Sequence, residues 1–256
     1  MRCPLLLSLV LAGVTCADDV RDNPPVRVTE APNPRLEEVL LGWAKASISA
    51  KQFRRTARMT LHDRVLQSVE TGSIDVYCCK PDLLRVDHMD EKGNPKEVVY
   101  CKGKEIHFFS GGQEHVFRLS DAFGFPDNPE RYPNTFLERF TGVLLEQASC
   151  LTVGFPVRTL RDRFDVRLTK EDEQWVYLEL RPRRSRDKEW YDLVQIVLHR
   201  KELWVRRVFT RQPNKNEITY DFEKPDTSKP VTVESIVKGL PVGWKRVECP
   251  DPATTP

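Results

Sequence analysis

The sequence lacks the short patterns that usually accompany catalysis. It has only five histidines, and no HExxH, CxxC, GxSxG, GxGxxG or phosphate-binding loop is present. Acidic residues are abundant but scattered, so no pair of carboxylates stands out as nucleophile or base. We therefore expect no catalytic residue, no metal site and no cofactor, and a secreted hydrolase remains only a third interpretation.

Charge of one sign is lacking as well. The 40 basic and 38 acidic residues are spread along the chain and leave a net charge of only +2. This balance argues against nucleic acid as a partner. At 39% hydrophobic and 9% aromatic, the composition is typical of a globular protein with a true core. We expect one folded domain that is monomeric.

Long hydrophobic runs are confined to the N-terminus. Arg2 precedes an apolar run from Leu5 to Val14, and the small residues up to Ala17 resemble a cleavage site. The run is shorter than the about 20 residues that span a bilayer. We predict a signal peptide over 1–17 and hence export to the periplasm or the medium, with lipid attachment at Cys16 as the alternative.

Cysteines are few, and cleavage would leave an odd number of them. Cys78 and Cys79 are neighbours on one predicted strand and therefore point to opposite faces, so they are not expected to bond to each other. Either could meet Cys101 on an adjacent strand. The pairing stays open, as does the alternative of buried thiols. Cys150 and Cys249 complete the set.

Regular structure is predicted to begin after a flexible, proline-containing leader at 18–33. Asn33 can cap a helix to about Ala50 whose apolar residues, among them Leu36, Val39, Leu40 and Trp43, recur at helical spacing. The period then changes to two, which predicts strands up to a helical insertion at 133–144 and 157–164. Further strands follow to Phe222, and the tail at 250–256 is expected to be loose. The predicted strands start at Ala57, Ile74, Leu83, Val98, Glu105, His115, Trp175, Leu193, Trp204 and Glu217.

Three stretches carry a resemblance to a known family. Gly72 to Arg85 reads as a strand, a Lys-Pro corner and an apolar strand. Val98 to Phe109 holds a Lys-Gly-Lys turn before an aromatic strand, and Glu217 to Gly243 ends in Leu-Pro-Val-Gly. In this order the chain resembles a distant, secreted bacterial member of the periplasmic lipoprotein-carrier superfamily, the LolA/LolB-like proteins.

The resemblance implies a fold and a ligand site. It implies an α+β, mainly β domain over 34–249, in which a strongly curved antiparallel sheet forms an incomplete β-barrel covered by helices. An apolar cavity between sheet and helices would accept acyl chains. The residues expected to line it are Trp43, Met59, Leu61, Ile74, Val76, Leu84, Val86, Ile106, Phe108, Ile196 and Leu198. The position of the family's lid-holding basic residue corresponds to Lys80, although lysine lacks the bidentate fork of arginine.

A basic segment offers a second contact surface. Arg181, Arg183, Arg184, Arg186 and Lys188 are expected to form a hairpin tip that contacts a partner protein or an anionic membrane. The leading hypothesis is thus a carrier that holds a lipid or an acylated protein. The alternative is an envelope sensor or protein-binding module with the same fold and a filled cavity.

Overall fold

The computed structural model describes residues 33–79, 83–102, 105–118 and 157–249. The predicted signal peptide, the leader up to residue 32, the tail and the helix at 133–144 lie outside the described residues, as do Lys80 and Cys150.

The first helix begins where the sequence predicts. α1 (Pro34–Ser49) is capped by Asn33, whose side-chain oxygen accepts hydrogen bonds from the backbone N–H groups of Arg35 and Leu36 at 3.0 and 3.3 Å. Proline is tolerated in the first turn, where its missing N–H has no intrahelical partner. Leu36, Val39, Leu40 and Trp43 on the apolar face of α1 are buried in the core.

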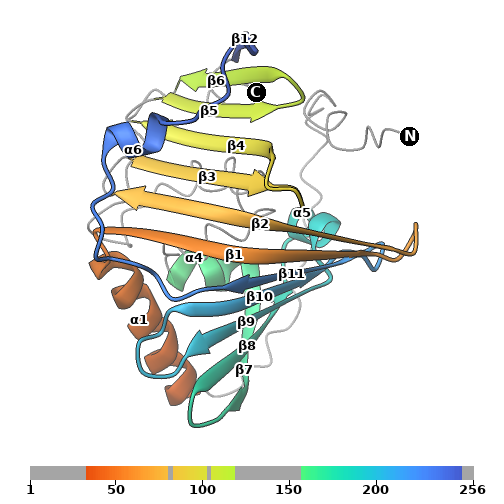
Figure 1. Cartoon of the computed structure of the whole chain (residues 1–256). Helices are drawn as coiled ribbons and strands as arrows, with labels where there is room; N and C mark the ends of the chain where they lie inside the picture. Colours follow the sequence, from red (N-terminus) through yellow and green to blue (C-terminus); the bar gives the residue numbers. More distant parts are fainter. Residues whose placement is uncertain (1–32, 80–82, 103–104, 119–156, 250–256) are drawn as a thin grey trace.

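A single open sheet of twelve strands makes up most of the described chain (Figure 1). The first six strands form a meander: β1 (Gln52–Asp63), β2 (Ser68–Cys79), β3 (Leu83–Met89), β4 (Pro95–Lys102), β5 (Glu105–Ser110) and β6 (Gln113–Arg118). The next five form a second meander: β7 (Phe164–Glu171), β8 (Trp175–Pro182), β9 (Leu193–His199), β10 (Val205–Arg211) and β11 (Glu217–Phe222). Because β11 pairs with β1, the two meanders join at the middle of the sheet.

The sheet is not closed, and its free edges are β7 and β12 (Lys245–Cys249). β12 pairs with β6 in parallel, whereas every other strand pairing of the described residues is antiparallel. The predicted class, a mainly β, incomplete barrel with few helices, is confirmed.

Several elements differ from the sequence prediction. The helix expected over 157–164 is α4 (Val157–Arg163), and the chain then enters β7, which the prediction lacks. The period-two alternation of Phe164, Val166 and Leu168 signals this strand, but its first residue also fits the end of the preceding helix. The prediction also lacks α6 (Val233–Val237) and β12, because five residues carry too little periodicity to identify an element.

The two faces of the sheet differ in character. The inner face bears the main core, which combines apolar residues of both meanders with Leu40 and Trp43 of α1 and Leu160 of α4. On the opposite, outer face, Ile236 of α6 packs against Leu83 and Tyr100. Figure 1 shows α6 in front of the sheet and α4 behind it. A curved sheet with apolar residues on one side thus accounts for most of the hydrophobic burial.

The sequence left open a pairing of Cys78 or Cys79 with Cys101 on an adjacent strand, and the structure shows that the strands of Cys78 and Cys101 are not adjacent. Both side chains are buried on the inner face, but β3 lies between their strands, and Leu84 is opposite each of them. The sequence pattern does not reveal this arrangement, because it does not show that β3, the strand after the Lys-Pro corner, lies between β2 and β4.

Candidate functional site

The inner face of the sheet carries the ten predicted strand residues of the cavity, as the pairing register shows. Val76 is opposite Val86, Leu84 is opposite Cys101, which in turn is opposite Ile106, and Ile196 is opposite Val208. Trp43 joins them from α1 and is 4% exposed. That these residues contact a ligand stays a prediction.

The inner face has a filled interior and a less covered rim. Ile74, Val86 and Ile196 are fully buried among other side chains, so the interior is packed. Towards the far end of β1, Met59 and Leu61 are only half-buried, and so is Ile218, which is directly opposite Leu61 on β11. We call Met59, Leu61 and Ile218 the rim patch. At the rim patch, the apolar core of this half of the sheet is partly exposed to solvent.

A charged residue that sequence reasoning did not identify is buried at the junction of the two meanders. Arg55 of β1 is 4% exposed, and its Nε donates a 2.8 Å hydrogen bond to the carbonyl of Glu223. Its Nη2 donates to the carbonyl of Val205 at the start of β10. The guanidinium carbon lies 4.6 Å from the ring centroid of Phe222. Arg55 thereby connects β1, β10 and the segment after β11.

This arginine has no carboxylate within ion-pair distance among the described residues. Burial, with a smaller contribution from nearby Arg206, lowers the pKa of Arg55 to about 9. The side chain is still protonated at neutral pH, and its charge is compensated by carbonyl dipoles and aromatic faces. The sequence signal was weak, since Arg55 is one of a pair of arginines in an alternating strand.

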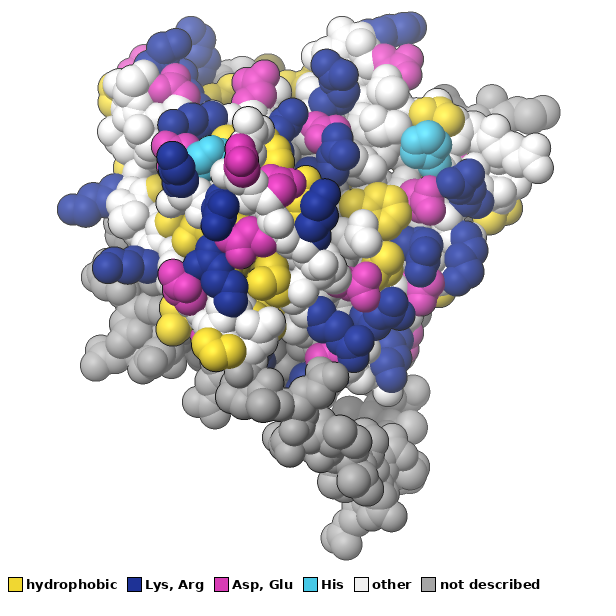
Figure 2. Space-filling view, turned by 90° about the horizontal axis from the view of Figure 1, so that it is seen from below, with side chains coloured by type: hydrophobic (Ala, Val, Ile, Leu, Met, Phe, Trp, Pro, Cys, Tyr) yellow, Lys and Arg dark blue, Asp and Glu magenta, His cyan; other side chains and the backbone are white. Residues whose placement is uncertain are grey.

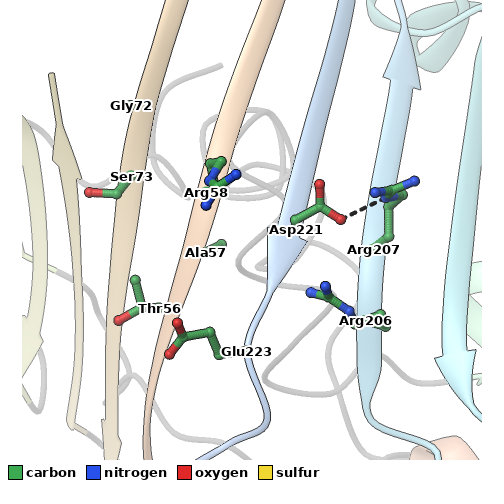
Figure 3. A pocket seen from close by; sticks show the side chains of 9 residues that line it. All are labelled: Thr56, Ala57, Arg58, Gly72, Ser73, Arg206, Arg207, Asp221 and Glu223. Atoms are coloured by element: carbon green, nitrogen blue, oxygen red, sulfur yellow. Dashed lines mark hydrogen bonds and ion pairs between the residues drawn. The ribbon is translucent and has the colours of Figure 1, made fainter. Parts of the chain in front are cut away.

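The described residues also form a groove on the outer side of the same junction, with a volume of about 570 Å³. We call it the outer groove (Figure 3). Figure 2, seen from below, shows basic and acidic side chains intermixed with hydrophobic ones over the face of the molecule that it displays. The outer groove is lined by Thr56, Ala57, Arg58, Gly72, Ser73, Arg206, Arg207, Asp221 and Glu223.

The predicted contact residues outside the inner face are only partly described. The basic segment connects β8 to β9 and contains α5 (Ser185–Trp190) in place of a tight hairpin tip. Arg181 and Arg183 are exposed and have acidic partners, Glu179 at 2.9 Å and Asp165 at 3.5 Å. Lys80, the predicted lid contact, lies outside the described residues, so its role stays a prediction.

Metal ligands and membrane-spanning helices are both absent from the part of the chain that the structure describes. No group of three or more His, Cys, Asp or Glu side chains among those residues is arranged to hold a metal ion. No described helix combines the length and the apolar character needed to cross a membrane.

The geometry defines a class of fold: an open, curved antiparallel sheet whose inner face is apolar and carries helices. Solved structures with a similar fold exist. A conserved protein of Thermus thermophilus, described as uncharacterized, is 11% identical, with a TM-score of 0.49 over 84% of this chain and 99% of that one.

A LolA superfamily protein of Nitrosomonas europaea is also similar, as the sequence predicted, with 7% identity, a TM-score of 0.36 and coverage of 79% of this chain and 97% of that one. The MucA/MucB complex of Pseudomonas aeruginosa gives 16% identity, a TM-score of 0.41 and coverage of 80% of this chain and 61% of that one. No family model and no curated protein matches the chain. At these identities the likeness concerns the fold alone.

Proposed function

We propose that this protein is an exported binding protein that holds an apolar group, the acyl chain of a lipid or of an acylated protein, against the inner face of its sheet. The observation that supports the proposal is the rim patch, where Met59, Leu61 and Ile218 continue the buried core but are themselves half-buried. Since the deeper interior is packed, the acyl chain would lie along the rim patch. Export is supported by the apolar run at the N-terminus.

The hydrophobic effect would drive such a contact. Burying one methylene fully gains about 0.8 kcal/mol, so roughly 10 kcal/mol before the costs of ordering is the upper limit for a chain of about a dozen carbons, and a chain covered on one side by the rim patch would gain a fraction of it. No polar partner or catalytic group is required for this. Specificity would come from the length and shape of the apolar surface.

The hairpin that joins β1 to β2 supports delivery by contact. Its tip exposes three apolar side chains: Val65 is 69% exposed, Leu66 66% and Val69 57%. The hairpin extends away from the rest of the sheet in Figure 1. A projecting apolar tip beyond the rim patch could touch the membrane or the protein that supplies or receives the acyl group.

A second candidate function is favoured by the packing of the interior. Most of the predicted lining residues are buried by other side chains of the chain itself, Ile196 and Leu198 completely. A filled interior is what a protein-binding module of the same fold would have. In that case the sheet and its hairpin would bind a protein, and no acyl chain would be bound.

Uptake of a fluorescent fatty acid by the mature chain tests the first candidate. Leu61→Glu places a charge in the rim patch and is expected to weaken uptake by at least about tenfold, because burying a carboxylate against an acyl chain is unfavourable. Thr60→Glu is the matched control, since Thr60 neighbours Leu61 on the same strand but faces outward. Equal uptake by both variants and the parent would contradict binding at the rim patch.

A further inference from the structure

We propose that the outer groove binds a phosphate ester. The groove crosses four neighbouring strands on the face opposite the apolar core, with residues from β2, β1, β11 and β10 (Figure 3). At about 570 Å³ it has the size of pockets that take small organic ligands. This site is separate from the rim patch, so it does not depend on the function proposed above.

The register concentrates guanidinium groups around one carboxylate. On β11, Asp221 is opposite Arg58 of β1 on one side and opposite Arg207 of β10 on the other. Side chains opposite each other on paired strands have Cβ atoms about 4.5–5.5 Å apart, so both arginines compete for Asp221. The carboxylate accepts from Arg207 Nε at 2.7 Å. Arg58 is exposed and has no ion pair with any described residue.

A bulge in β10 adds a third arginine. The register shifts between Val205 and Arg207, and Arg206 is the extra residue, whose Nη1 donates a 2.6 Å hydrogen bond to the carbonyl of Phe222. Bulges commonly redirect a side chain in this way. The Arg206 side chain lines the groove together with those of Arg58 and Arg207.

The outer groove has a positive net charge, and the buried Arg55 on the other side of the sheet adds to the positive potential there. Its lining holds three arginines against the two carboxylates of Asp221 and Glu223. Arg55 lies close behind, donating to the carbonyl of Glu223 and interacting electrostatically with Arg206. Four arginines gathered at one junction repel each other, and a bound anion would relieve that repulsion.

The donor set favours phosphate over carboxylate. Guanidinium groups bind both anions through paired N–H donors. Here they come from two strands on either side of β11, and the hydroxyl of Ser73 lines the same groove. A tetrahedral phosphate can accept from several directions at once, whereas the two oxygens of a carboxylate lie in one plane. The source could be a soluble phosphate ester or a phospholipid headgroup, which share this chemistry.

Two probes test the proposal and distinguish the sources. Binding of glycerol 3-phosphate to the full mature chain is measured by calorimetry, and binding to phosphatidylglycerol vesicles by co-flotation, both at low salt. We expect Arg58→Gln and Arg206→Gln each to weaken binding of the responding probe at least about fivefold. Arg246→Gln removes an exposed arginine that pairs with Glu248 at 2.8 Å on the edge strand β12, far from the outer groove, and should leave binding unchanged.

The outcomes are decisive in either direction. Binding of glycerol 3-phosphate indicates a soluble ligand, and binding of vesicles alone indicates a headgroup; both support the site if the two groove variants lose it. If neither probe binds, or if Arg246→Gln weakens binding as much as Arg58→Gln does, the proposal is wrong. Because Arg58 is exposed, its variant should fold normally, and fatty-acid uptake by the same variants should be unaltered. Loss of both activities in every variant would instead indicate misfolding, which thermal unfolding of Arg58→Gln reveals.

Discussion

At the scale of single residues, the junction between the two meanders depends on Arg55. Its guanidinium reaches backbone carbonyls of two other segments and lies over the Phe222 ring. A lysine could not do this equally well, because its ammonium lacks the planar fork that spans two acceptors. The residue therefore combines an unfavourable burial of charge with favourable fixed contacts.

Removal of this side chain should destabilise the fold. Arg55→Ala leaves the buried carbonyl of Val205 and the partly buried carbonyl of Glu223 without their donor, and a gap beside Phe222, so we expect a loss of about 2–4 kcal/mol in the free energy of unfolding. Arg58→Ala, three positions along the strand and exposed, should change it by less than about 0.5 kcal/mol. Denaturant titration measures both. An Arg55→Ala variant as stable as Arg58→Ala would show that the contacts of Arg55 contribute nothing.

The start of α1 is tied to the edge strand by a charge pair. Arg35 donates to Glu171 of β7 through Nη2 at 2.6 Å and Nε at 3.0 Å, and this lowers the pKa of Glu171. An acid whose pKa is lowered in the folded state adds stability above its unfolded pKa. That stability is lost as the pH falls through the lower folded pKa.

The pH dependence of Glu171→Gln follows from this sign. Relative to the parent chain, the variant should lose about 0.5–1 kcal/mol at pH 7, and the difference should shrink towards zero below about pH 4. Glu38→Gln is the control, because Glu38 also pairs with Arg35 but is 70% exposed. Unfolding curves of the parent chain and both variants, measured at several pH values, test this predicted pH dependence. A difference that stays constant down to about pH 3 would mean that the ion pairs of Glu171 with Arg35 and Arg200 are not its cause.

At the scale of elements, close contacts fix where β2 and α1 sit. A Cβ on Gly72 would lie 2.4 Å from the backbone carbonyl oxygen of Met89. A Cβ on Gly42 of α1 would lie 2.6 Å from Cδ1 of Leu203, which is the end of a flexible side chain. The first neighbour cannot move without shifting β3, whereas the second can rotate away.

The two glycines should therefore respond differently to alanine. Gly72→Ala is expected to cost about 1–3 kcal/mol through overpacking. Gly42→Ala should be close to neutral, because about 1 kcal/mol of helix propensity offsets the displacement of Leu203. Thermal and denaturant unfolding of the two variants provides the comparison. Equal destabilisation would contradict the distinction between backbone and side-chain neighbours.

Most of the helices and strands could be predicted from the sequence. Period-two alternation located ten strands, and the Asn-Pro start located α1. Gly72 keeps the regular register opposite Met59, and the close approach of the Met89 carbonyl explains why a glycine occupies this position. The missed elements are β7, which follows a helix directly, and α5, α6 and β12, which are too short for a period to be recognised.

At the scale of the whole molecule, alternation along each strand was enough to assign the ten predicted cavity residues to one face. It could not show how far side chains fill the space beside that face, nor that β11 returns to pair with β1. The arginines of the outer groove come from positions far apart in the chain, and only this pairing brings Arg58 near Arg207. Sites that depend on long-range register are therefore invisible to local pattern reading.

The central claim is that the inner face binds an apolar group at the rim patch. Native mass spectrometry of the mature chain purified from its own envelope, followed by lipid extraction, tests it most directly. We predict a stoichiometric acylated species that is present in the parent and in Thr60→Glu but absent in Leu61→Glu. Ligand-free protein in all three, together with failure to take up a fluorescent fatty acid, would contradict the claim and favour the protein-binding module.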